Sequence, residues 1–281
     1  MRHVKEEYHD VVPLKKIYKN NKPFPHIVLD NFIDEELLNN VLDEFPDLYT
    51  VENKRSFNEP KQIKFGSIGF ENLSDTANQL ISFLNNDIFL KYLQELTGIK
   101  EPLISDPYLS GGGYHEIKNG GVLKVHADFN RHPSLELDRR VNLLLYLNKN
   151  WEEEWGGNLE LYSPNNLNEP VVKITPEFNR CVIFNTTSYT YHGHPDVISC
   201  PEQISRKSIA LYYFSTGRPK SEVSEKHSTM WKEVKGETFE PDPLTFGKII
   251  KKVTPPIIFD FMKGIHKKLI VHYFRIFNFL C

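Results

Sequence analysis

The chain has 281 residues, 40% of them hydrophobic and 25% charged, and its formal net charge is −3. This length is enough for one large domain, or for one domain with a substantial extension. The small negative charge excludes the global basic field that favours nucleic acid, and no run of about 18 apolar residues predicts a membrane-spanning helix.

Two further features predict a cytoplasmic protein. The start Met1-Arg2-His3-Val4-Lys5 is too polar to form the apolar core of a signal peptide. The three cysteines, Cys181, Cys200 and Cys281, include no Cys-x-x-Cys pair, and such a sparse set suits a reducing compartment.

The first third of the chain is predicted to be mostly helical. Residues 1–22 are polar, and we expect an exposed lead-in there. A strand is predicted over residues 24–32, where turn formers flank apolar residues. Apolar residues then recur at helical spacing between residues 33 and 100; the first helical pattern begins at Asp34, and Ser74 is a candidate N-cap of a later one. These helices are expected to support one face of a sheet.

Residues 50–72 interrupt this helical pattern. They are polar and irregular, which favours a plain connection over a loop that faces a substrate. From residue 103 to 218, short strands alternate with turns such as Gly111-Gly112-Gly113, a pattern typical of a β-sandwich or double-sheet jelly roll. We therefore expect a mainly β core with flanking helices, an α+β chain, in one domain over residues 23–218.

The tail differs from the rest of the chain in charge. Residues 219–254 are predicted to be a loop region, and residues 255–281 a basic amphipathic helix. From Lys248 onward there are seven lysines and arginines against one acid, Asp260. Such a helix is typical of a peripheral anchor, here on the inner face of the cytoplasmic membrane. Packing on the core or against a second subunit, as in a dimer, is an equal alternative.

A His-x-Asp pair, His126 and Asp128, is the strongest chemical signal in the predicted β-core. In an extended strand, residues two apart project to the same face, so the imidazole and the carboxylate are directed to one point. One more histidine would complete the two-histidine, one-carboxylate set of non-haem Fe(II) oxygenases. Taken alone, the pair is weak evidence for a metal site, because chance matches are common and a surface His–Asp pair gives the same pattern.

Candidates for the remaining positions lie further along the chain. His192 or His194, in Tyr191-His192-Gly193-His194, could be the third ligand. Arg206 enters an apolar strand, where a cation needs an anionic partner. That partner could be a ligand carboxylate held by two parallel hydrogen bonds, or an ordinary aspartate or glutamate.

The order of these pieces resembles the Fe(II)/2-oxoglutarate-dependent dioxygenase superfamily, specifically its prolyl-4-hydroxylase-like branch. The resemblance covers roughly residues 24–218. Its characteristic pieces are PFPHIVLDNF, VHADFN, VNLLLYLN, WGGNLELY, PEFNRCVIFN, YHGHP and SRKSIALYYF. It implies a double-stranded β-helix, a relative of the jelly roll and the cupins, with helices packed on the major sheet.

The resemblance also implies roles for individual positions. His126 and Asp128 match the first two iron ligands, and His192 matches the third in preference to His194. His194 is then expected near the site, in contact with substrate or with a ligand residue. Arg206 matches the basic residue that pairs with the far carboxylate of 2-oxoglutarate.

Three further residues are candidates for contacts around the cosubstrate. Tyr146 matches a position that can donate a hydroxyl to the same carboxylate, and Asn142 projects to the same face of its strand. The tyrosine that often precedes the His-x-Asp pair by about ten residues in this family is replaced here by Glu116 and Ile117 or shifted to Tyr114. Tyr114 is therefore a candidate for contact with substrate or with a ligand residue.

The implied chemistry uses Fe(II), 2-oxoglutarate and O2, with ascorbate as a further candidate cofactor. Oxidative decarboxylation of 2-oxoglutarate to succinate would be coupled to hydroxylation of a substrate C–H bond. We expect first a membrane-presented glycan or lipid-linked sugar, such as the Kdo of a lipopolysaccharide precursor. The alternatives are a protein prolyl hydroxylase and a non-catalytic jelly-roll binding module.

Overall fold

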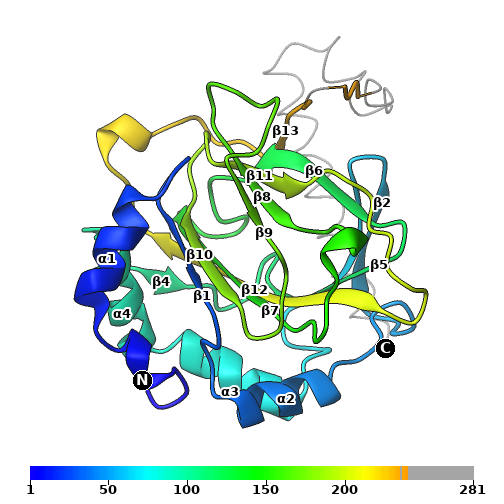
Figure 1. Ribbon diagram of the computed structural model, residues 1–281. Helices are drawn as coiled ribbons and strands as arrows, with labels where there is room; N and C mark the ends of the chain where they lie inside the picture. The colour runs from blue at the N-terminus through cyan, green and yellow to red at the C-terminus, as the bar shows by residue number, and fades with distance from the viewer. Residues whose placement is uncertain (235, 240–281) are drawn as a thin grey trace, which may run out of the picture. The chain divides into compact units, whose positions relative to one another are not determined.

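The computed structural model describes residues 1–234 and 236–239, which form a curled antiparallel sheet with helices along one side (Figure 1). One compact unit spans Met1–Glu237. The predicted basic helix over residues 255–281 lies outside the described residues.

The helices of the described part are mostly N-terminal. They are η1 Glu6–Tyr8, α1 Val11–Asn20, α2 Glu35–Asp43, α3 Asp75–Leu84, α4 Asp87–Thr97, η2 Glu153–Trp155 and η3 Lys220–Glu222. The strands are β1 His26–Leu29, β2 Lys54–Glu59, β3 Gln62–Ser67, β4 Ile104–Ser105, β5 Gly113–Lys118, β6 Val122–Ala127, β7 Asp138–Tyr146, β8 Leu159–Tyr162, β9 Val172–Ile174, β10 Cys181–Asn185, β11 Tyr191–His194, β12 Ser205–Ser215 and β13 Met230–Trp231.

The sheet runs in the order β1-β10-β7-β12-β5-β3-β6-β11-β8-β9, and the named strand pairs are antiparallel. Strand β3 pairs with β5 at one end and with β6 at the other, so it joins the two halves of the curl. The predicted double-stranded β-helix is confirmed by this arrangement.

Two apolar clusters explain the layering. The larger one lies between the helices and the outer face of strands β1, β7, β10 and β12, and includes Leu38, Leu80, Leu93, Leu143 and Ile183. The smaller one fills the inside of the curl. Its buried members are Phe24, Tyr146, Leu159, Leu161, Ile174, Val182 and Phe184. The inner and outer clusters draw on alternate residues of β7 and β10, as a sheet buried on both faces requires.

Helix ends follow the capping residues in the sequence. The side chain of Asp34 accepts a hydrogen bond from the Leu37 amide at 3.0 Å, and that of Ser74 accepts one from the Ala77 amide at 3.2 Å. Both satisfy amides that have no partner within the helix. The last long helix, α4, ends at Gly98, whose φ of 70° is the left-handed cap conformation.

Residues 1–22 differ from the exposed lead-in that was expected. They contain α1, which buries Val11, Leu14 and Tyr18 against the rest of the core, and the Tyr18 hydroxyl donates to Asn185 Oδ1 at 2.6 Å. The three buried residues recur at three- and four-residue spacing, a helical pattern that the surrounding lysines obscure.

Residues 50–72 also differ from the expected connection, because β2 and β3 form a hairpin there. Within residues 219–254, expected as a loop region, Met230 and Trp231 form β13 and pair with Ala127 and His126 of β6. Both segments therefore belong to the sheet that carries the His-x-Asp pair.

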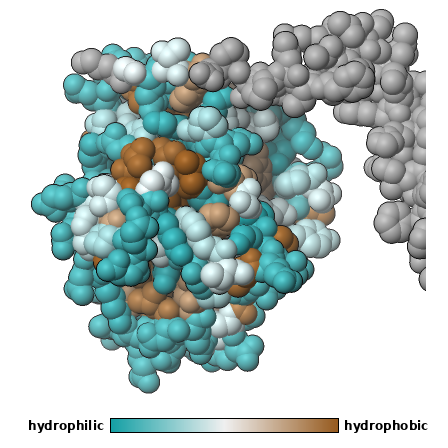
Figure 2. Space-filling view, turned by 90° about the vertical axis from the view of Figure 1, so that its right-hand side faces the viewer, coloured by the Kyte–Doolittle hydropathy of each residue, from teal (hydrophilic) through white to brown (hydrophobic). Residues whose placement is uncertain are grey.

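The described helices include none that is both long and apolar enough to cross a membrane. Figure 2 shows one face of the molecule, where hydrophilic residues predominate and hydrophobic ones form separate patches. Exposed large apolar side chains, such as Val12, Tyr189 and Val223, are far apart in the sequence. Single exposed apolar residues of this kind are normal on protein surfaces.

Asn179 ties the N-terminal segment to the sheet and gives a test of the fold. Its buried side chain accepts from the Ile33 amide at 2.9 Å and donates to the Ile33 carbonyl at 2.7 Å. Asn179→Ala should lower the free energy of unfolding by about 2–4 kcal/mol, because two buried backbone groups lose their partners. Chemical denaturation followed by circular dichroism measures this loss.

Asn150 is a matched control, since it is exposed and has a similar positive φ, 52° against 62° for Asn179. Asn150→Ala should cost only about 1 kcal/mol, for the less favourable left-handed backbone. Equal losses in the two variants would contradict the assigned role of the Asn179 side chain.

Candidate metal centre

Cross-strand register brings the two candidate histidines together. On β6 and β11, His126 is the direct partner of His192, and directly opposed residues of an antiparallel pair project to the same face. Asp128 follows His126 by two residues, immediately after the end of β6, and comes to the same place.

The three side chains form a compact, buried group. Nε2 of His126 lies 3.7 Å from Oδ1 of Asp128, and Nε2 of His192 lies 3.4 Å from Oδ2. The ligand atoms all lie within 4.8 Å of one another. His194, the other candidate, is not part of this group.

Hydrogen bonds fix which ring nitrogens face inward. Nδ1 of His126 lies 2.8 Å from the Lys124 carbonyl oxygen, and Nδ1 of His192 lies 3.0 Å from that of Thr190. A carbonyl oxygen only accepts hydrogen bonds, so each Nδ1 carries the proton. The Nε2 lone pairs are therefore directed to the carboxylate of Asp128, in the tautomer that a metal ion needs.

Electrostatics keep the group in its metal-binding form. Burial lowers the pKa of His126 to about 3, and it lowers the pKa of His192 as well, so both rings are neutral at pH 7. Burial alone would raise the pKa of Asp128, but the charge of Arg139 and contacts with both imidazoles outweigh it and hold that pKa below its usual value.

This donor set fits a divalent first-row metal ion. Two neutral imidazoles and one carboxylate on a single face leave further coordination positions open, which is the arrangement of non-haem Fe(II) oxygenases. None of the three ligands has to change protonation for the ion to bind, and the backbone carbonyls already orient both rings.

Arg139 is a component of the site that sequence reasoning missed. It is 1% exposed, and its Nη2 lies 3.0 Å from Oδ2 of Asp128. Its guanidinium carbon also lies 4.3 Å from the ring centroid of Phe129 and 3.5 Å from that of Tyr212. Asn142, predicted to line the pocket, accepts from Arg139 Nε at 2.9 Å and donates to the same carboxylate oxygen at 2.7 Å. Both residues hold Asp128 in place.

A signal for Arg139 was present in the sequence. It is a cation within the apolar strand β7, so the argument applied to Arg206 applies equally to it: a buried cation needs an anion. The family resemblance predicted a role for Arg206 only, because it assigns no role to residues at the start of β7.

Arg206 lies on β12, the strand that pairs with β7, which carries Arg139 and Asn142. It is 6% exposed, its Nε donates to the Gly157 carbonyl at 2.7 Å, and its Nη2 donates to the Tyr146 hydroxyl at 3.2 Å. Within the described residues no carboxylate lies at ion-pair distance from Arg206, so the ordinary aspartate or glutamate partner is not observed. The guanidinium is positioned to receive an anion from the cavity.

One cavity joins these groups. Its lining consists of the three triad residues together with Lys64, His115, Ile117, Leu123, Arg139, Asn142, Leu144, Leu159, Gly193, His194, Arg206, Ser208 and Tyr212. His194, expected near the site, is therefore on the cavity wall, and burial together with the charge of Arg206 lowers its pKa well below its ordinary value.

The structure does not bring Tyr114 to this cavity. Its ring packs against Phe45 in the helical layer, and its hydroxyl lies 3.3 Å from Ser74 Oγ. The next residue, His115, projects to the opposite face and lines the cavity instead. The expected substrate contact of Tyr114 is thus wrong, since strand alternation turns its side chain away.

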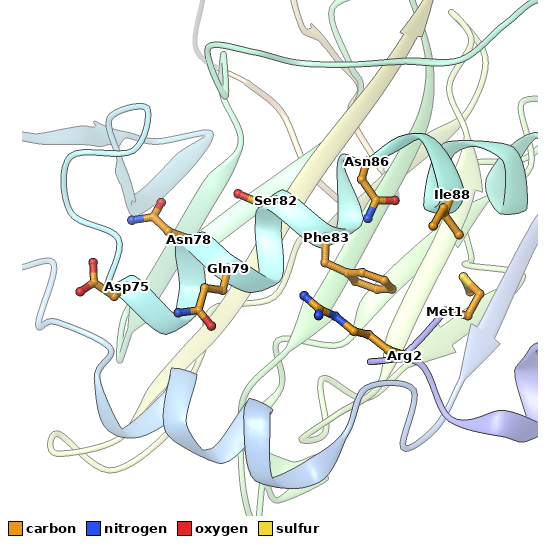
Figure 3. Close-up of a pocket in the computed structure, with 9 residues that line it drawn as sticks. All are labelled: Met1, Arg2, Asp75, Asn78, Gln79, Ser82, Phe83, Asn86 and Ile88. Atoms are coloured by element: carbon orange, nitrogen blue, oxygen red, sulfur yellow. The ribbon is translucent and has the colours of Figure 1, made fainter.

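A larger cavity, of about 830 Å3, lies among the N-terminal segment and helices α3 and α4 (Figure 3). Its lining includes Arg2, Phe83 and the amide side chains of Asn78, Gln79 and Asn86, but Asp75 is its only carboxylate and it has no histidine. The triad cavity is smaller, yet it alone of the two contains a metal-ligating set, so we place the functional site there.

Comparisons with known proteins agree with this geometry. Residues 112–214 match the model of the 2OG-Fe(II) oxygenase superfamily. Over 198 residues the chain is 27% identical to prolyl 3-hydroxylase OGFOD1 from Mus musculus, an alignment that covers 68% of this chain and 33% of the relative. The chain thus spans about a third of the length of this curated relative.

Solved structures share the fold at low sequence identity. A prolyl-4-hydroxylase from Pseudomonas putida superposes with a TM-score of 0.51 and 16% identity, over 73% of this chain and 99% of that one. HygX from Streptomyces hygroscopicus, solved with nickel, 2-oxoglutarate and hygromycin B, gives 0.50 and 12%, over 78% and 96%. At these identities the likeness establishes the fold alone.

The triad assignment predicts the metal content of single variants. Replacing His126 or His192 with alanine removes one of three ligands, so Fe(II) binding should fall by more than the roughly 10–100-fold expected for a supporting residue. Metal content after anaerobic reconstitution measures this, and His194→Ala is the control that should keep its metal. Loss of metal in His194→Ala but not in His192→Ala would transfer the third ligand to His194.

Proposed function

The chain belongs to the 2OG-Fe(II) oxygenase superfamily, and we propose that it is a prolyl hydroxylase that acts on a peptide or protein. The observation that carries the oxygenase class is the buried group of two neutral imidazoles and one carboxylate, in the segment that matches the family. The presence of the complete set argues against a non-catalytic binding module.

The substrate class is supported by the relatives. Those from Mus musculus and Xenopus laevis are named prolyl 3-hydroxylases, and their alignments cover 68% and 63% of this chain. The lipid-linked sugar expected first, such as Kdo, has no support among the comparisons, and the prolyl alternative fits them better. HygX, solved with hygromycin B bound, shares this fold, so the fold alone does not decide the substrate and a direct test is needed.

The proposed division of labour follows from the contacts. Bound Fe(II) and 2-oxoglutarate, with O2, would supply oxidative decarboxylation to succinate coupled to hydroxylation of the substrate. His126, Asp128 and His192 would hold the metal ion in one orientation. Arg206 and Tyr146 would orient the distal carboxylate of the cosubstrate, because their polar groups are already hydrogen-bonded to each other on the paired strands β12 and β7.

The residues around the triad would keep this geometry constant. Arg139 and Asn142 hold one oxygen of Asp128, which leaves the other free of these two partners. Apolar side chains such as Leu144 and Leu159 form part of the wall and exclude water from the reacting centre. The protein would therefore orient the metal ion and cosubstrate and exclude water from the cavity, and the cosubstrate would supply the oxidising chemistry.

The cellular location and the assembly state of the protein are proposed from composition alone. A cytoplasmic location rests on the cysteine usage, and membrane contact or dimer formation rests on the composition of residues 255–281. Truncation at Pro255, followed by vesicle flotation and mass measurement, separates the two uses of that segment.

Arg206 provides a test of cosubstrate binding. Arg206→Ala should weaken 2-oxoglutarate binding to the anaerobic metal-loaded protein by about 2–5 kcal/mol, since a buried charged pair would lose one partner. Tyr146→Phe should cost only about 1 kcal/mol, the value of one hydrogen bond. Titration calorimetry measures both. Equal affinity in the wild type and Arg206→Ala, with an intact fold, would sink the assignment.

The prolyl substrate is tested by product analysis. Iron-loaded protein with 2-oxoglutarate and O2 should add one oxygen atom to prolyl peptides and form succinate in equal amount, which mass spectrometry detects. Peptides with alanine in place of proline, and the His192→Ala protein, are the controls that should show no gain. Oxygen added to a glycan or lipid-linked sugar extract, and to no prolyl peptide, would reverse the substrate assignment.

A further inference from the structure

The cavity contains a lysine that the proposed chemistry does not use. Lys64 lies on β3 between Gln62 and Gly66, which share its face of the strand. These neighbours pair in register with Leu123 and His115, and both partners line the cavity. Residues in register on antiparallel strands project to the same face, so β3 presents Lys64 to the cavity, as its place in the lining also shows.

The Lys64 ammonium group is not paired with a carboxylate in the part of the chain that the structure describes. Its Nζ lies over the ring of Phe57, 5.2 Å from the ring centroid. Burial lowers the pKa of Lys64 to about 8, although the charge of Asp128 acts in the opposite direction. At pH 7 the side chain therefore remains mostly protonated, with part of its hydration lost.

Cationic groups exceed anionic ones on the cavity wall. The charged residues of the lining are Lys64, Arg139 and Arg206 against the single carboxylate of Asp128. The histidines of the lining do not change this balance, because burial lowers the pKa of each of them. Fe(II) and the 2-oxoglutarate dianion have equal and opposite formal charges, so loading them would leave the excess of positive charge in place.

Each of the two arginines has an assigned anionic partner, and Lys64 has none assigned. Arg139 is paired with Asp128 at 3.0 Å, and Arg206, on β12, is assigned to the distal carboxylate of 2-oxoglutarate. Lys64 comes from a different strand, in the hairpin β2–β3, and β3 lies between the cavity-lining strands β5 and β6. Its charge is available to a molecule that enters after the cosubstrate.

We propose that Lys64 recognises a carboxylate of the substrate, so that acidic prolyl substrates are selected over neutral ones. This inference rests on the proposed function. The carboxylate could belong to an acidic side chain next to the prolyl residue, or to the α-carboxylate of a proline at the end of a chain. In either case a charge-assisted hydrogen bond would compensate the ammonium group for its lost hydration.

The test compares matched peptides that differ by one charge. One pair contains an internal Asp-Pro or Asn-Pro step, and the second ends in proline as the free acid or as the amide. Affinity is measured anaerobically on protein loaded with Mn(II) and 2-oxoglutarate, so that no turnover is required. Hydroxylation rates, as kcat/KM from succinate formation with Fe(II), are measured separately.

In the wild type, one of the two acidic peptides should bind at least about tenfold more tightly than its neutral partner, and the pair that shows this identifies the source of the carboxylate. The preference should disappear in Lys64→Met and persist in Lys64→Arg. Lys149→Met is the matched control, because Lys149 lies outside the cavity lining and its Nζ is also 5.2 Å from a ring, that of Phe178.

Three results would overturn the proposal. The first is that the wild type binds acidic and neutral peptides equally well. The second is that Lys64→Met keeps the preference for the acidic peptide, and the third is that Lys64→Met loses as much affinity for 2-oxoglutarate as for the acidic peptide. The third would mean that the cosubstrate supplies the anion. The first needs no variant, so the test stands even where a substitution impairs folding.

The same measurements separate this proposal from the proposed function. Peptides with alanine in place of proline keep the acidic residue, and they should show the same Lys64-dependent affinity. Charge-dependent binding without any hydroxylation would refute prolyl hydroxylation and support the carboxylate site. Hydroxylation without a preference for acidic peptides would support prolyl hydroxylation and refute the carboxylate site. The absence of both charge-dependent binding and hydroxylation would refute both proposals.

Discussion

The pairing of β6 with β11 is the constraint on which the rest of the site depends. His126 and His192 are opposed residues, and a slip of one residue in either strand would direct one imidazole to the other face. Gly193 makes the pairing possible. A Cβ atom there would lie 2.8 Å from the Leu123 carbonyl oxygen and 2.9 Å from that of Lys124, so only glycine permits the strands to approach this closely.

Groups of the protein itself orient all three members of the triad. Two backbone carbonyls set the rings, a buried arginine and an asparagine set the carboxylate, and the pKa shifts hold all three groups in the protonation state that binds a cation. Arg139 and Asn142 therefore contribute to the geometry of the site through their contacts with Asp128.

The sequence predicted those parts of the chain in which a local pattern decides the structure. Helical spacing identified α2, α3 and α4, and strand alternation with glycine turns indicated the β-core. The two-residue spacing of His126 and Asp128 indicated a shared face, and the choice of His192 over His194 came from the family resemblance. In the structure His126, Asp128 and His192 form one group, and His194 lies on the cavity wall.

The parts that the sequence did not predict depend on partners far away in the chain. The hairpin β2–β3 is polar because much of its surface faces solvent or the cavity, and its pairing with β5 and β6 is not visible locally. Tyr114 and His115 are neighbours, and the choice of which one faces the cavity depends on where β5 begins. A helix in residues 1–22 was hidden by lysines on its exposed side.

The strand β13 has a consequence for how this polypeptide can be divided. Trp231 pairs with His126 through the backbone and stacks on its ring at 5.1 Å, and Asn130 bonds to Ser224, Glu225 and His227. The segment that matches the family ends at residue 214, before all of these contacts. A fragment cut at that boundary would leave the backbone of a metal ligand exposed along its edge. The autonomous unit therefore extends beyond the family boundary, and proteolysis or fusion between residues 215 and 231 would act directly on the ligand geometry.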